Sequence, residues 1–94
     1  MKFIETVVAT WKELSNPALQ GNIKRSEDGS RLTIEVTTKQ YTATIAAWEQ
    51  AYSMDITVIE LVSNTGVLLS AGECTSLDEM KERITLLCEM LSKE

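Results

Sequence analysis

Aromatic and acidic residues gather between residues 48 and 55, where their types and spacing suit protein recognition rather than catalysis. Trp and Tyr side chains are common anchors of protein interfaces, and carboxylates beside them can pair with a basic partner. Two acids further along the chain extend this set. The predicted partner-binding residues are Trp48, Glu49, Tyr52, Asp55, Glu60 and Glu73.

A structural interpretation of the same cluster stays open. Trp48 and Tyr52 could instead cover the end of a sheet and bury apolar area within the fold. In that case the pair would contribute to stability and not to recognition.

The residues needed for most enzyme chemistry are missing. The chain has no histidine, so the commonest general base and every Ser–His or Cys–His nucleophile pair are excluded. The four glycines are scattered and form no phosphate-binding loop. Cys74 and Cys88 match no metal-ligand spacing and are expected to be buried, reduced thiols. We therefore predict no catalytic, cofactor-binding or metal-binding residues and no enzymatic activity, with a carboxylate-only enzyme using Asp55 as the alternative.

The charge is distributed unevenly along the chain. Residues 1–47 contain five acids and six bases, for a charge of +1, whereas residues 48–94 contain nine acids and three bases, for −6, and the two sum to the net charge of −5. Phosphate contacts need clustered Lys and Arg, which disfavours direct binding of nucleic acid. An acidic half favours docking onto a basic protein, although acids also simply keep a small protein soluble.

Length and hydropathy indicate one small cytoplasmic domain. Ninety-four residues are enough for a single core. No apolar run approaches the ~18 residues of a membrane span. The first residues lack the pattern of a signal peptide, because Glu5 and Lys12 interrupt the apolar stretch.

The hydrophobic pattern predicts a helix, a sheet and a second helix. An apolar stripe over about residues 2–15 predicts the first helix, which Pro17 ends. The sheet spans about residues 22–73 and begins with a short strand from Ile23 to Ser26. An Asp28–Gly29 hairpin, a reversal at Gln50–Ser53 and an Asn64–Gly66 turn separate its strands. Residues 59–62 break the alternation, which predicts a bulge or a strand covered on both faces.

Alternation within the strands assigns their faces. The face that includes Ala43, Ile45 and Ile56 is predicted to be the core, whereas Trp48 points to the opposite, mainly polar face. The last helix, at about residues 76–92, starts at a Ser76-x-x-Glu79 capping box. Its predicted buried stripe consists of Leu77, Met80, Ile84, Leu87, Cys88 and Leu91.

These elements predict an α+β fold. Each helix has one apolar stripe and the sheet has one apolar face, so the economical packing is a two-layer sandwich. We expect a single domain, 1–94, in which a four- or five-stranded antiparallel sheet carries both helices on one face.

Short motifs in the second half resemble a known family. They are Ala43-Thr44-Ile45, Trp48-Glu49, Asp55-Ile56-Thr57-Val58-Ile59, Thr65-Gly66 and Ser76-Leu77-Asp78-Glu79-Met80. They resemble the TriTu-type family of immunity proteins of bacterial contact-dependent growth inhibition, over about half of the chain. The resemblance implies a small cytosolic protein that neutralises one cognate toxin domain, often a nuclease or tRNase with a basic cleft.

Composition, charge and resemblance together favour an immunity protein that occludes a toxin domain. The expected complex is 1:1, with a monomeric immunity protein and without direct contact to nucleic acid or membrane. The alternative is a small acidic secretion chaperone, which would bind an effector segment as a dimer.

Overall fold

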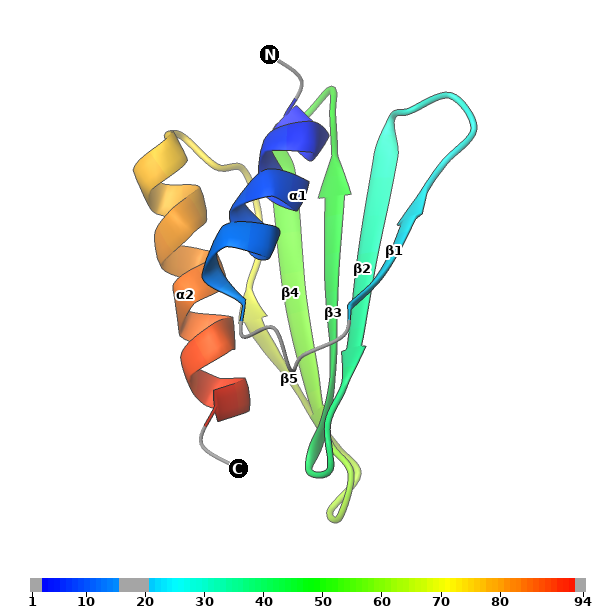
Figure 1. Cartoon of the computed structure of the whole chain (residues 1–94), viewed down its shortest axis with the longest axis vertical. Helices are drawn as coiled ribbons and strands as arrows, with labels where there is room; N and C mark the ends of the chain where they lie inside the picture. The colour runs from blue at the N-terminus through cyan, green and yellow to red at the C-terminus, as the bar shows by residue number, and fades with distance from the viewer. Residues whose placement is uncertain (1–2, 16–20, 93–94) are drawn as a thin grey trace.

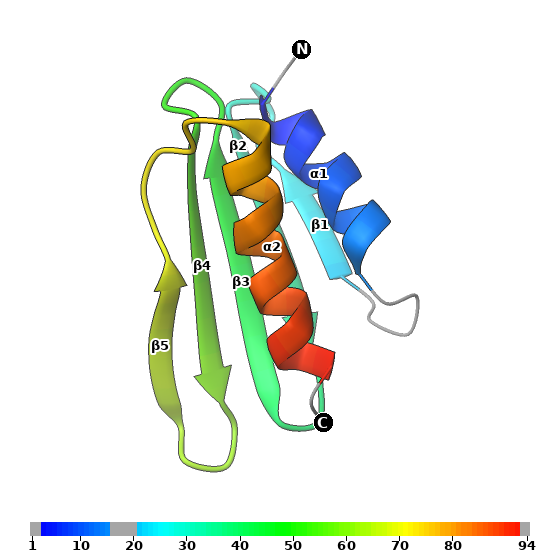
Figure 2. The same cartoon turned by 90° about the vertical axis from the view of Figure 1, so that its left-hand side faces the viewer.

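A computed structural model of the chain describes residues 3–15 and 21–92, and these residues form two layers (Figure 1). Seven elements follow one another: α1 (Phe3–Leu14), β1 (Gly21–Arg25), β2 (Arg31–Thr37), β3 (Tyr41–Trp48), β4 (Ser53–Glu60), β5 (Thr65–Ser70) and α2 (Leu77–Ser92). The five strands form one antiparallel sheet in the order β1-β2-β3-β4-β5. Both helices lie on the same face of that sheet (Figures 1 and 2). The predicted α+β sandwich is thereby confirmed, with five strands.

The core is built on the three central strands. Ile34 of β2 pairs with Ile45 of β3, and Ile45 pairs with Ile56 of β4, so the three isoleucines form one row across the sheet. All three side chains are fully buried. Branched apolar residues pack well on a pleated surface, and burial of each contributes about 1.5–3 kcal/mol. The predicted core face is correct.

Helix α1 packs its predicted stripe against this row. Phe3, Ile4, Val7, Val8 and Trp11 are buried. A Cβ atom on Gly21 would lie 2.9 Å from Nε1 of Trp11, so the helix approaches β1 where β1 has no side chain. Strand β1 runs from Gly21 to Arg25, so it starts before the predicted Ile23 and ends before the predicted Ser26. The predicted helix start at residue 2 and the helix-ending Pro17 lie outside the described residues.

Helix α2 starts with the predicted cap, with one change. The Ser76 hydroxyl oxygen accepts from the Glu79 amide at 3.1 Å, as expected. The Glu79 carboxylate, however, accepts from the amide and hydroxyl of Thr75, one residue before Ser76. Leu77 was assigned wrongly to the buried stripe, because it is the first helical residue and its side chain is 48% exposed.

The β4–β5 hairpin differs from the prediction. Its turn covers residues 61–64 and ends at Asn64, which has a φ of 55°, so Thr65 and Gly66 already belong to β5. Leu61 and Val62 lie exposed in this turn, and the irregularity of the pairing falls between Ile56 and Thr57 instead. The error arose because an apolar run was interpreted as strand. Among the described residues no helix is long and apolar enough to cross a membrane.

Candidate partner-binding surface

Trp48 lies on the sheet face opposite the helices. It is the last residue of β3 and follows the buried Ala47, so strand alternation turns its ring to the open face. Arg31 of β2 is its cross-strand neighbour, and the guanidinium carbon of Arg31 lies 5.8 Å from the centroid of the Trp48 ring. This is the geometry of a cation–π contact. The predicted orientation of Trp48 is correct, and its half-buried ring already has a cationic neighbour.

Glu49 has a structural partner that the sequence does not reveal. Its two carboxylate oxygens accept hydrogen bonds from the backbone amides of Phe3 at 2.7 Å and Ile4 at 3.2 Å. These amides belong to the first turn of α1, where backbone donors have no partner within the helix. A carboxylate there also meets the positive end of the helix dipole. Glu49 therefore caps α1 from the end of β3.

Tyr52 lies on the other side of the sheet from Trp48, with the helices. Its ring meets Phe3 edge to face, with 5.5 Å between centroids and 89° between ring planes. The side chain is 52% exposed, and its backbone has a φ of 48°. A bulky residue is uncommon at positive φ and is strained there. The sheet thus separates the two predicted aromatic anchors.

A shallow apolar hollow surrounds Tyr52. Its volume is about 490 Å³. Its lining includes Phe3, Tyr52, Glu73, Leu77 and Met80. Exposed Tyr52 and Leu77 lie at its surface, and α1, the β3–β4 turn and the start of α2 supply its walls.

The remaining predicted acids lie in three different places. Asp55 is on the open face, where its carboxylate accepts from the Gly72 amide at 3.2 Å and holds the turn after β5. Glu73 forms an isolated bridge with Ser53, beside Tyr52. Glu60 is the last residue of β4, roughly 23 Å along the strand from Ser53. The structure therefore brings Glu73 to Tyr52 but leaves Glu60 far away.

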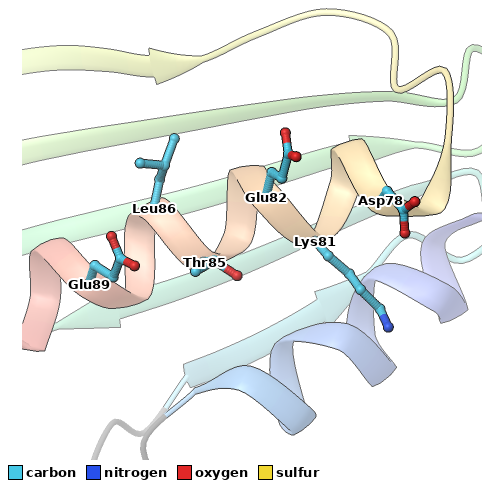
Figure 3. A pocket seen from close by; sticks show the side chains of 6 residues that line it. All are labelled: Asp78, Lys81, Glu82, Thr85, Leu86 and Glu89. Carbon is cyan, nitrogen blue, oxygen red and sulfur yellow. The ribbon is translucent and has the colours of Figure 1, made fainter.

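An acidic stripe on α2 was missed by the sequence interpretation. Asp78, Glu82 and Glu89 are exposed, and their spacing along the helix puts them on one side together with Leu86, which is 53% exposed (Figure 3). Lys81 points away from this stripe, toward α1. The signal was present as acids at helical spacing, but charged residues on a helix are usually just solvated.

Four acids on this side of the molecule lack partners within the part of the chain that the structure describes. The carboxylates of Glu73, Asp78, Glu82 and Glu89 make no hydrogen bond or ion pair with another residue of 3–15 or 21–92. We call these four residues together with Tyr52 and Leu77 the acidic helix surface.

Glu79 and Arg83 are set apart from that surface because they act within the fold. Arg83 donates to the carbonyl oxygens of Gly72 and Glu73, both at 3.0 Å, and pairs with Glu79. The Thr75 hydroxyl and amide, followed by Arg83, lower the pKa of Glu79 to about 2. Together they fasten the β5–α2 connection to the helix.

Neither thiol is placed for chemistry. Cys74 and Cys88 are free and buried, as predicted, and burial raises the pKa of both thiols. No group of three His, Cys, Asp or Glu residues in the described segments is placed to hold a metal ion.

No protein-family model, curated protein or solved structure matches the chain. The family resemblance in residues 43–80 therefore stays a prediction. The structure shows that the residues of the predicted cluster lie apart, and it reveals the acidic helix surface.

Proposed function

We propose that this chain is an immunity protein that binds a basic cognate toxin domain, a nuclease or tRNase domain, and neutralises it by stoichiometric occlusion. One observation carries the proposal: the acidic helix surface combines four carboxylates that have no partner among the described residues with an exposed tyrosine and leucine. The chain would act in the cytoplasm as a monomer in a 1:1 complex.

The electrostatics favour a basic partner. Arg83, a cation on the same helix, already donates to backbone carbonyls and pairs with Glu79, and Lys81 points to α1. The acidic helix surface therefore projects negative charge with little local compensation. A cleft that binds RNA or DNA phosphates is basic, so carboxylates held on a rigid helix can compete for it.

Tyr52 provides the apolar anchor of this surface. Aromatic side chains that are half exposed within an apolar hollow are frequent centres of binding energy. Its edge-to-face contact with Phe3 positions the ring before a partner arrives.

Charge reversal tests the proposal. The double variant Glu82→Lys/Glu89→Lys should weaken binding to an inactivated candidate toxin domain, taken from a secreted protein encoded next to the gene, by about 10-fold or more, because close charge pairs at interfaces contribute ~1.5 kcal/mol or more each. Isothermal titration calorimetry gives the dissociation constant.

A matched control is available on the same chain. Glu27→Lys/Glu35→Lys makes the same change in net charge at two exposed acids of the loop and strand far from α2. It should leave the dissociation constant within about twofold of the wild-type value, as expected for surface charges remote from an interface. If both double variants weaken binding equally, the acidic helix surface is not part of the interface.

A second candidate, the dimeric secretion chaperone, is favoured by one feature. Strand β5 ends the sheet with an exposed, uncharged edge, which two copies could join. Light scattering separates the two functions, because the chaperone requires an obligate homodimer and the immunity protein a monomer.

A further inference from the structure

The two edges of the sheet differ in how readily they could pair with a strand of another chain. Strand β1 ends in Lys24 and Arg25, and charged side chains on an edge strand discourage further pairing. Strand β5, Thr65–Ser70, has no charged residue and no proline, and Val67 and Leu68 are 50% and 61% exposed. Such an edge is a template for another strand.

Helix α2 leaves β5 uncovered. Figure 2 shows the helix over the middle of the sheet, with β5 beyond it. Val67 pairs with the buried Val58 and so lies on the helix side, whereas Leu68 pairs with Thr57 and lies on the open face. The strand therefore offers one exposed apolar side chain to each face.

The direction of the main-chain groups of β5 follows from two hydrogen bonds of β4. The Leu61 amide donates to the Gln40 carbonyl on the β3 side, and the Met54 amide donates to the Gly72 carbonyl on the β5 side. Because these groups alternate along β4, the N–H and C=O groups of Val58 and Glu60 point toward their register partners in β5.

Those partners, Val67 and Thr65, direct their main-chain groups back to β4. Gly66 lies between these two residues and Leu68 follows Val67. The N–H and C=O groups of Gly66 and Leu68 consequently point away from β4, to solvent.

We propose that this edge receives an extended, basic segment of the partner as a sixth strand, hydrogen-bonded to Gly66 and Leu68. The segment would alternate apolar side chains, which cover Val67 or Leu68, with Lys or Arg. This inference rests on the proposed function and names how the toxin domain would attach.

Charge favours a basic partner over a second copy of this chain. Glu82 and Leu86 extend from α2 on the side where β5 lies (Figure 3). Lys or Arg side chains on the helix side of an added strand would therefore meet Glu82. Antiparallel pairing of two β5 edges would instead place an uncharged strand beside β5, which offers no basic group to Glu82.

The test separates the main-chain contribution from the side chain. Leu68→Pro removes the outward N–H but keeps the bonds to β4, because proline is tolerated on an edge strand where the N–H faces solvent. Leu68→Ala removes the side chain and keeps the N–H. Both are titrated with the inactivated toxin domain, after circular dichroism has shown that each variant folds.

We expect Leu68→Pro to weaken binding about 10- to 100-fold relative to Leu68→Ala, since an acceptor of the partner loses its donor. In the wild-type complex, amide hydrogen exchange at Gly66 and Leu68 should slow. If Leu68→Pro fails to fold, this exchange measurement alone decides.

Three results overturn the inference, and they are distinguishable. If the wild-type chain binds the toxin and Leu68→Pro binds it as tightly as Leu68→Ala does, the β5 edge is not the binding site. The same follows if the Gly66 and Leu68 amides exchange in the complex as fast as in the free chain. In both cases the proposed function stands. A free wild-type dimer that Leu68→Pro converts to a monomer assigns the edge to self-pairing. A wild-type chain that does not bind at all refutes the edge and the proposed function together.

Discussion

At the scale of single residues, Glu49 changes its role most once the fold is known. The sequence places it beside Trp48 as a partner-binding acid, whereas the structure shows it bonded to the first two described amides of α1. A cap supplied from 45 residues away cannot be found from local pattern, because capping rules concern neighbours in the sequence.

This role predicts a loss of stability. Glu49→Ala should lower the free energy of unfolding by ~1 kcal/mol, the usual value of a helix cap. Chemical denaturation measures it, with the exposed neighbour Gln50→Ala as the control that stays near wild type. If the two variants are equally stable, the cap contributes nothing.

The aromatic residues allow a second prediction at this scale. Tyr52→Asn removes the ring from the hollow and suits the positive φ, since Asn tolerates that backbone conformation. Toxin binding should weaken by more than ~2 kcal/mol, as for an aromatic hot spot. Trp48→Ala, on the open face, should weaken it less. The reverse order in titration calorimetry would move the interface to the open face.

At the scale of elements, the strand and helix patterns could be predicted and their ends could not. The alternation around Ile34, Ile45 and Ile56 identifies the core face directly, because burial on one side imposes a period of two. The turn after β4 was misplaced because Leu61 and Val62 are apolar yet exposed. In the sequence, an exposed apolar residue gives the same signal as a core residue.

The candidate site was predicted in part for a related reason. The residues between 48 and 55 are close in sequence, but the sheet divides them, with Trp48 on one face and Tyr52 on the other. Helical spacing puts Asp78, Glu82 and Glu89 on one stripe, but it could not show that their carboxylates lack partners among residues 3–15 and 21–92.

The cap of α2 predicts a dependence of stability on pH. The pKa of Glu79 is lowered from its ordinary 4.5 to about 2, so the fold favours the carboxylate form. Its stabilising contribution is therefore complete above pH 4.5 and is lost as the pH falls from 4.5 to about 2.

Glu79→Gln should consequently be less stable than wild type at neutral pH. The difference in unfolding free energy should shrink below pH 4.5 and vanish near pH 2. Urea denaturation across this range measures it. A difference that stays constant as the pH falls would mean that the carboxylate charge is not what stabilises the cap.

At the scale of the whole molecule, α2 contributes both to the core and to the surface. Its buried residues pack with the sheet and α1, whereas its outer face and the edge strand β5 present exposed apolar side chains and acids that have no partner among the described residues. Strand β5 is the edge strand beyond β4, and Glu82 and Leu86 extend from α2 on the side where β5 lies. A basic toxin domain could contact them together, which relates the acidic helix surface to the proposed sixth strand.

The most direct test of this account is whether the chain forms a complex with a candidate toxin domain, taken from a large secreted protein encoded next to its gene. We predict a 1:1 complex that survives size-exclusion chromatography at micromolar concentration, with an association rate that falls as salt is raised, because charge steers the encounter. Separate elution of the two proteins at micromolar concentration would contradict the proposed function.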